Sequence, residues 1–268
     1  MRWLAMPAAL TPAEIFDRAA AEGERRLDQN MLELLATGFI AGFTVVFGIA
    51  IMGIVEWFGR PQLADLSRVA GALAFAPAVV FLVVGRAELF SENFFDPIAA
   101  WFRFPEKQVA ARLFRLWVVT LVLNLVGGML MVLLFSVEGS LPPGASDSFN
   151  RIAEEIVDRR VVDTFARAIA GGALVALLSF FVAAADSTAA RILLAYMVGV
   201  VLALGSFDHV VVSALNLGFG LVLGASIQPV AVAMTFGITI LGNLLGGIGL
   251  VTLSHAAQAQ DARRRDRD

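Results

Sequence analysis

The sequence contains no cysteine, and its 268 residues include only two histidines and one tyrosine. Without cysteine the chain cannot form a disulfide framework, use a thiol as a catalyst or bind a metal through thiolates. Two histidines do not make a transition-metal cluster without carboxylate ligands, so we expect neither a metal nor a cofactor. Charged residues are also scarce, at 16%, and the formal net charge of −3 does not indicate a nucleic-acid partner.

Long apolar runs are what the sequence has in abundance. Hydrophobic residues make up 59% of the chain and the mean hydropathy is +0.80, outside the range of soluble globular proteins, where about a quarter of the residues are charged. A hydrocarbon core of roughly 30 Å requires about 20 apolar residues in each helix. Six stretches approach this length: 31–57, 70–102, 110–136, 164–185, 190–222 and 228–255. The sequence therefore predicts an all-α membrane protein with six transmembrane helices.

A short motif occurs twice in the chain. NLVGG at residues 124–128 returns as NLLGG at residues 243–247, 119 positions later. The same offset places a polar interruption of the second span, residues 88–93, over a polar interruption of the fifth span, residues 207–209. Paired breaks in corresponding spans of two halves are typical of a transport site near the bilayer midplane. We therefore expect two related halves whose second and fifth helices are broken.

The chain divides into five segments on this interpretation. They are a cytoplasmic amphipathic segment at 1–30, a first transmembrane half at 31–136, an outer loop with a short helix at 137–163, a second transmembrane half at 164–255 and a cytoplasmic charged tail at 256–268. Lysine and arginine number 13 on one side and 6 on the other, so the positive-inside rule places both termini in the cytoplasm of a cell (inner) membrane.

Both flanking segments carry helix signals. The amino end lacks the pattern of a signal peptide, and we expect instead a helix that Thr11 caps, with Pro12 at its first position and Glu14 completing a capping box. The outer loop is expected to end in a short amphipathic helix from about Ser148.

The first break is expected to form a loop. Pro97 disfavours helical geometry in the residue before it and Gly85 loosens the preceding turn, so the sequence predicts a loop over residues 87–96 and a half-helix over residues 98–102. In hydrocarbon an unpaired backbone group costs several kcal/mol, so a loop at this depth persists only against protein or a water-filled cavity. The two breaks should therefore mark the conduit.

Several residues near this loop are candidates for the pore lining. We expect Leu89 and Phe90 to form an apolar constriction and Ser91 to supply a hydrogen-bonding hydroxyl, with Phe75 as a second aromatic group. The alternative is that Phe90 and Phe75 pack between helices, as is common for phenylalanine in a chain that has 21 of them.

The second break contains the only histidine at membrane depth, His209, which follows Phe207 and Asp208. An ionisable residue inside a membrane indicates a functional site. Imidazole titrates near neutral pH and can donate a hydrogen bond to an anion in either charge state. The alternative is a neutral ring bonded to a carbonyl or to Asp208. Because the other half has a matching break, we expect His209 and Phe207 to serve the pore.

The remaining polar residues of the breaks are expected to support the structure. Arg86, Glu88 and Glu92 should pair with one another or with loop amides, because an unpaired charge in a membrane is strongly disfavoured. Asn124 and Asn243 are interpreted as anchors of the broken backbone, since asparagine bonds across helices or onto free backbone groups.

From about residue 30 to 255 the chain resembles the formate/nitrite transporter family. The resemblance is carried by GRAELFSEN at 85–93, RAIAGGALVALL at 167–178, SFDHVV at 206–211 and GNLLGGIGL at 242–250. It implies an aquaporin-like inverted repeat, a homopentamer in which each protomer has its own pore, and small monovalent anions as substrates. It also implies that His209 binds the anion or supplies its proton, and that Leu89, Phe90, Ser91 and Phe75 match pore positions.

The sequence departs from the family pattern at three positions. The usual outer lysine aligns near Ile156, and two usual asparagines are replaced by Gly172 and Ser213. Attraction of anions would then depend on arginines of the outer approach: Arg159, Arg160 or Arg167.

The leading hypothesis is a proton-linked channel or transporter for formate, nitrite or a similar small monovalent anion, or for its conjugate acid. Two alternatives remain: a pore for small neutral solutes, and a membrane scaffold that does not conduct. We do not expect an enzyme, because no nucleophile, base and orienting group occur together at membrane depth.

Overall fold

The computed structural model describes residues 10–63, 65–105 and 108–265. Its helices are α1 (Pro12–Leu27), α2 (Met31–Leu63), α3 (Leu66–Gly85), the 3₁₀ helix η1 (Phe90–Phe94), α4 (Asp96–Arg103), α5 (Val109–Phe135), α6 (Ala145–Val157), α7 (Val161–Ala184), α8 (Thr188–Leu204), α9 (Val210–Leu223), α10 (Pro229–Leu244), the π-helix η2 (Leu245–Thr252) and α11 (Leu253–Arg265). The described part of the chain is therefore helical throughout, with short connections.

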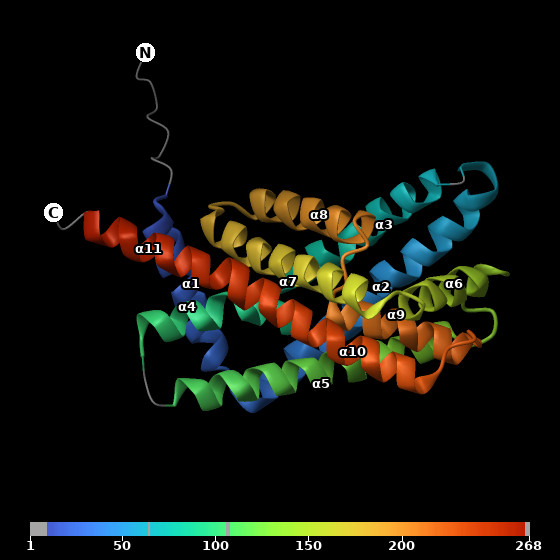
Figure 1. Cartoon of the computed structure of the whole chain (residues 1–268), viewed down its shortest axis with the longest axis horizontal. Coiled ribbons are helices and arrows are strands. Elements are labelled where there is room, and N and C mark those ends of the chain that lie inside the picture. Colours follow the sequence, from blue (N-terminus) through green and yellow to red (C-terminus); the bar gives the residue numbers. More distant parts are fainter. Residues whose placement is uncertain (1–9, 64, 106–107, 266–268) are drawn as a thin grey trace, which may run out of the picture.

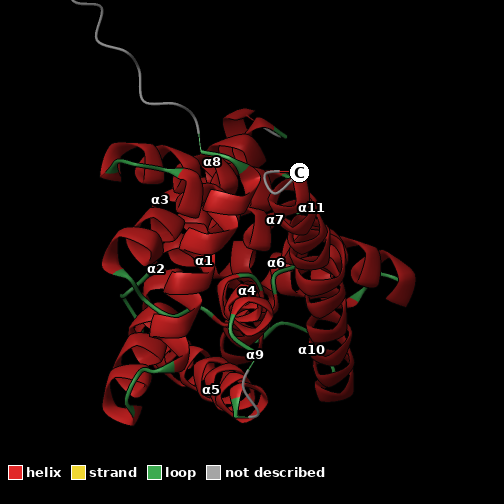
Figure 2. Ribbon diagram, turned by 90° about the vertical axis from the view of Figure 1, so that its left-hand side faces the viewer, coloured by secondary structure: helices red, strands yellow, loops and turns green. Residues whose placement is uncertain are grey.

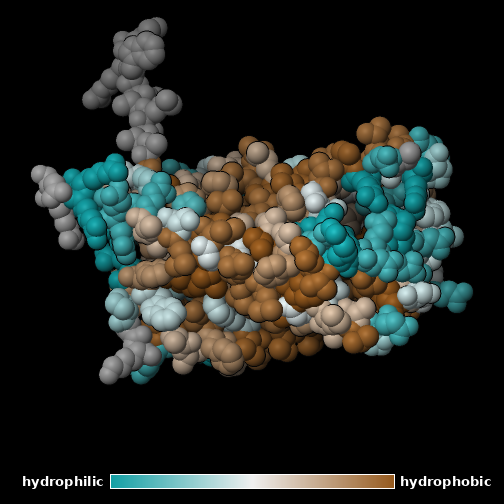
Figure 3. All heavy atoms as spheres, in the orientation of Figure 1, coloured by the Kyte–Doolittle hydropathy of each residue, from teal (hydrophilic) through white to brown (hydrophobic). Residues whose placement is uncertain are grey.

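The long helices lie side by side in one bundle (Figure 1). Within the described ranges, α2, α3, α5, α7 and the continuous run from α10 to α11 are each long and apolar enough to cross a membrane. Seen from one end, α4 and α9 lie in the interior, among the longer helices (Figure 2). Hydrophobic side chains cover the middle of the visible face and hydrophilic ones gather at both ends (Figure 3), the distribution that a bilayer requires.

Two spans are broken, as the repeat predicts. The second consists of α3, η1 and α4, and the fifth of α8 and α9. The first half-helix ends in both cases at a residue in the left-handed region, Arg86 with φ 53° and Ser206 with φ 49°. Gly85, which we expected to loosen this turn, is only the last residue of α3. The expected loop over 87–96 contains η1, and α4 begins at Asp96, with Pro97 in its first turn.

The flanking helices begin at defined caps. At α1 the backbone N–H of Thr11 donates to Glu14 Oε2 over 2.7 Å and the N–H of Glu14 donates to Thr11 Oγ1 over 3.3 Å, which completes a capping box. The outer helix α6 begins at Ala145, three residues before the expected Ser148, because Gly144 with φ 84° turns the chain into the helix.

Each half contains one close helix crossing, and both crossings require glycine. A Cβ on Gly42 of α2 would lie 2.1 Å from the carbonyl oxygen of Asn124 in α5. A Cβ on Gly172 of α7 would lie 2.2 Å from the carbonyl oxygen of Asn243 in α10. Gly172 is therefore a position of direct backbone contact, and the main chain of Asn243 occupies the space that a side chain there would need.

The repeated Gly-Gly motif supplies the next contact at each crossing. A Cβ on Gly127 would lie 2.2 Å from the carbonyl oxygen of Phe39, and one on Gly246 would lie 1.9 Å from that of Ile169. Since Phe39 and Ile169 occupy matching places on α2 and α7, the motif repeats because the crossing repeats.

We predict that Gly172→Ala lowers the stability of the protein, since the added methyl group overlaps the Asn243 backbone and overpacking typically costs about 1–3 kcal/mol. Gly237→Ala is the matched control, because a Cβ there has nothing within 4 Å and alanine favours a helix interior. Thermal unfolding of the detergent-purified protein measures both. Equal melting temperatures for the two variants would contradict the assignment of Gly172 as a position of direct backbone contact.

Candidate functional site

Asn124 holds the break in the second span. Its side-chain Oδ1 accepts from the backbone N–H of Phe90 over 2.9 Å, and its Nδ2 donates to the carbonyl of Glu88 over 3.0 Å and to that of Gly38 over 2.8 Å. Asn124 is fully buried. One side chain therefore satisfies backbone groups that the interrupted helix leaves free, and ties them to α2.

Asn243 does the same for the fifth span. Its Oδ1 accepts from the N–H of Val210 over 2.9 Å, and its Nδ2 donates to the carbonyls of Asp208 over 2.8 Å and Ala168 over 2.7 Å. The residues bonded at the two breaks lie 120 positions apart, so the hydrogen-bonding pattern is the same in both halves. It fixes the start of α9 and therefore the position of His209.

His209 occupies the N-cap of α9, with a relative exposure of 1%. The N–H of Val212 donates to its Nδ1 over 3.4 Å, so this nitrogen is the acceptor. In the neutral ring the proton is then on Nε2, which lies in hydrogen-bonding contact with Ser91 Oγ from the other break. The N-terminal end of a helix carries partial positive charge, and the ring thus lies where an anion is favoured.

A small central chamber of about 20 Å³ adjoins this ring, enough for about one water molecule. Among the residues that line it, only His209 and Glu92 are polar or charged. Leu89 and Phe75, which the sequence predicts as pore residues, belong to the apolar part of the lining.

A second cavity of about 280 Å³ adjoins the chamber and includes Phe207 in its wall. We call it the outer cavity, because it lies at the end of the bundle that the sequence predicts to face away from the cytoplasm. Three residues line both spaces: Phe75, Leu202 and Val212. These residues stand between the outer cavity and the chamber, and we call them the outer neck. The outer neck is entirely apolar.

Asp208 faces this outer cavity and pairs with Arg159, whose Nη1 lies 2.8 Å from Oδ1 and 3.0 Å from Oδ2. Ser213 Oγ donates to Asp208 Oδ1 over 3.3 Å. The alternative in which Asp208 bonds the His209 ring is therefore not what the structure has. Ile156, near which the resemblance implies a lysine, is buried, and Arg159, three residues later, lines the outer cavity.

An inner cavity of about 630 Å³ lies on the opposite side of the chamber, and α1 forms part of its wall. Three residues line both the inner cavity and the chamber: Leu82, Leu178 and Glu92. We call these residues the inner neck. Its one carboxylate distinguishes it from the outer neck.

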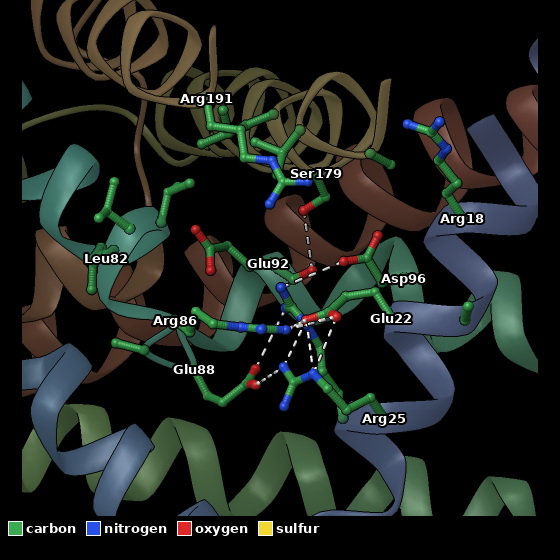
Figure 4. Close-up of a pocket in the computed structure, with 18 of the residues that line it drawn as sticks. Arg18, Glu22, Arg25, Leu82, Arg86, Glu88, Glu92, Asp96, Ser179 and Arg191 are labelled. Carbon is green, nitrogen blue, oxygen red and sulfur yellow. Dashed lines mark hydrogen bonds and ion pairs between the residues drawn. The ribbon is translucent and has the colours of Figure 1, made fainter. Parts of the chain in front are cut away.

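Ion pairs join α1 to the first break in this inner cavity (Figure 4). Arg26 lies 3.4 Å from Glu88 and 3.4 Å from Asp96, so both carboxylates share one buried guanidinium. Glu22 pairs with Arg25 over 2.6 Å. Burial alone would raise the pKa of the Glu22 carboxyl, but the hydrogen bond and charge of Arg25 and the charge of Arg26 hold it below its usual range.

Some of the predicted pore residues line the three cavities and others do not. His209 and Ser91 meet, although they lie 118 positions apart in the sequence. Phe90 lines none of the three cavities described here; its ring packs edge-on against Phe94 at a centroid distance of 5.0 Å. Its backbone N–H, bound by Asn124, is the part that serves the break.

Apart from Phe75, sequence reasoning missed the apolar neck residues, because a leucine or valine in an apolar helix carries no signal that separates it from its neighbours. Glu92 did carry a signal, as a charged residue in an apolar span, but we expected it to be paired. Arg86 is paired, with Glu22 at 3.1 Å. Across the described residues, no group of three or more His, Asp or Glu side chains could hold a metal ion.

Comparison with known proteins gives a consistent result. Residues 13–257 match the family model described as "Formate/nitrite transporter". The chain is 25% identical over 250 residues to "Inner membrane protein YfdC" of Escherichia coli (strain K12), which covers 92% of this chain and 78% of that protein.

Solved structures agree in fold. An "FNT family ion channel" superposes with a TM-score of 0.79 at 18% identity, over 91% of this chain and 98% of that one. A "Pentameric formate channel with formate bound" superposes with a TM-score of 0.69 at 16% identity, over 84% and 96%. These likenesses confirm the predicted fold class, an all-helical membrane protein with an aquaporin-like inverted repeat.

We predict that Asn124→Ala and Asn243→Ala destabilise the protein by similar amounts. Each removes the partners of one backbone N–H and two carbonyls, and a buried group left unsatisfied costs about 1–3 kcal/mol. The yield of folded protein and its melting temperature in detergent measure the effect. A large loss in one variant beside none in the other would contradict the equivalence of the two breaks.

Proposed function

Because the chain belongs to the formate/nitrite transporter family, we propose that it carries a small monovalent anion, such as formate or nitrite, or its conjugate acid, through a pore centred on His209. The family consists of transporters and not of enzymes, in agreement with the expectation from the sequence. The observation that carries the proposal is the series of three cavities, in which the smallest contains the buried histidine.

The two necks explain why a proton donor is needed between them. Moving a bare anion into a narrow apolar passage removes its hydration and is strongly unfavourable, whereas the neutral acid does not pay this cost. The three side chains that form the outer neck, those of Phe75, Leu202 and Val212, are all apolar. An anion that reaches the chamber therefore needs compensation there for its lost hydration, by a hydrogen bond or by a proton.

His209 and Ser91 supply that compensation in our proposal. The anion replaces Ser91 Oγ as the acceptor of the Nε2–H, at the positive end of α9. The ring first takes up a second proton from water and becomes imidazolium, which then gives one proton to the anion. The ring returns to its neutral form, and the anion leaves as the neutral acid, which crosses the next neck. The Nδ1 contact with Val212 holds the orientation of the neutral ring.

Arg159 takes over the role of an outer cation in this proposal. It lines the outer cavity, and its ion pair with Asp208 offsets the repulsion that this carboxylate would exert on an entering anion. We also propose that both termini lie in the cytoplasm, which the excess of basic residues on that side of the membrane supports.

We also propose that the chain is a homopentamer of a cell inner membrane. Large apolar side chains are exposed along α5, such as Val118, Val122 and Val126, where lipid or a neighbouring subunit covers them. The solved formate channel with the same fold is described as pentameric.

We predict that liposomes containing the purified protein take up formate or nitrite at a rate that rises as pH falls from 8 to 5, and that His209→Ala lowers this rate at least about tenfold, the change that 1.4 kcal/mol produces. Stopped-flow uptake measures it, with acetate and lactate as further probes. His255→Ala is the matched control, because this second histidine bonds the Val251 carbonyl and lines none of the three cavities.

No uptake of any anion by an intact oligomer would contradict the proposal. Passage of glycerol or urea under the same conditions would then favour a pore for neutral solutes, and no passage of either class would favour a scaffold.

A further inference from the structure

Glu92 is a buried carboxylate without a partner. Its relative exposure is 5%, and within the described ranges its carboxylate makes neither a hydrogen bond nor an ion pair, although the charge of Arg26 acts on it. Its backbone, in contrast, is bound: the N–H donates to the Leu89 carbonyl over 3.1 Å, and its own carbonyl accepts from Ser179 Oγ over 3.4 Å. The backbone is therefore fixed and the charged end is left free.

The neighbouring carboxylates behave differently. Glu88 and Asp96 each lie 3.4 Å from Arg26, which compensates their charge. Figure 4 shows the Glu92 carboxylate extending toward Leu82, away from the ion pairs among Glu22, Glu88 and the arginines of α1. A stabilising salt bridge does not explain why a charged residue occupies this place.

Its position in the passage offers an explanation. Glu92 lines the inner cavity and also the central chamber, and it is the only polar member of the inner neck. A solute that moves between the chamber and the inner cavity must therefore pass this carboxyl group. No comparable group stands in the outer neck.

We propose that Glu92 is a specificity-determining residue, whose carboxyl group decides by its charge whether a monovalent anion can cross the inner neck. This inference rests on the proposed transport of a small anion. In the ionised form the carboxylate repels the anion across a short, poorly solvated distance. In the protonated form the repulsion is absent and the O–H is a hydrogen-bond donor to the passing solute.

Other charged or titratable groups line the two spaces that Glu92 lines. They are Arg18, Glu22, Arg25 and Arg26 of α1, Arg86 and Glu88 of the break, Asp96 of α4, Arg191 of α8 and His209 at the start of α9, whereas α7 contributes Ser179. Most of these charges pair with one another. Glu92 can thus change its protonation without breaking an ion pair.

The test compares Glu92→Gln with the wild type in liposomes, with formate as the probe at pH 5 to 8. Glutamine has the shape of the protonated acid and never carries charge. We expect the variant to transport formate at pH 8 at least about tenfold faster than the wild type, with a flatter pH profile, because removal of a like charge at contact distance has an effect of this order or larger. Glu92→Asp should keep the wild-type profile.

Glu24→Gln is the matched control, since it removes one carboxylate from an exposed position on α1 that lines none of the three cavities, and it should leave the profile unchanged. Glu92→Ala provides a second neutral variant in case the glutamine variant does not assemble, as judged by size exclusion. Wild-type flux together with an unchanged or lower flux at pH 8 in the folded neutral variants would overturn this inference alone. Absence of wild-type flux would overturn the proposed function and this inference with it.

Discussion

The structure depends on one constraint: a helix that is broken inside a membrane leaves backbone groups that neither lipid nor water can satisfy. Asn124 and Asn243 meet this constraint with the same three bonds, to one N–H and one carbonyl of the break and one carbonyl of a crossing helix. Their side chains are short, so the crossing helices must approach until backbone touches backbone. Gly42 and Gly127 permit this in the first half, and Gly172 and Gly246 in the second. The glycines, the asparagines and the breaks therefore form a single structural requirement, met twice.

This requirement also positions the histidine. The bond from Val210 to Asn243 fixes the first turn of α9, and the ring of His209, immediately before it, is held at the N-terminal end of that helix. The corresponding bond from Phe90 to Asn124 brings Ser91 to the same point from the other half. His209 and Ser91, 118 positions apart, meet because His209 directly precedes Val210 and Ser91 directly follows Phe90. An asparagine binds the backbone N–H of Val210 and of Phe90.

The sequence predicts those features that depend on local chemistry or on repetition. The spans follow from hydropathy, the start of α1 from its capping box, and the paired breaks from the offset of the repeated motif. It does not predict which way a side chain turns once the backbone leaves the helix. Phe90 turns toward Phe94, and the carboxylate of Glu92, four residues after Glu88, extends away from the ion pair between Glu88 and Arg25. Both outcomes depend on how α1 and the neighbouring helices pack against the break, which no local sequence pattern predicts.

The two ends of the passage treat charge in different ways. At the outer mouth Arg159 and Asp208 neutralise each other, and the outer neck beyond them is apolar, so entry there depends on the loss of hydration more than on the sign of a charge. At the inner neck the Glu92 carboxyl lines the passage, and in our proposal the sign of the solute's charge is decisive there. A pore with this asymmetry separates two steps in the passage of a weak acid: the loss of its hydration at one neck and the control of its protonation state at the other. His209 lies between them and is the one group that can take part in both.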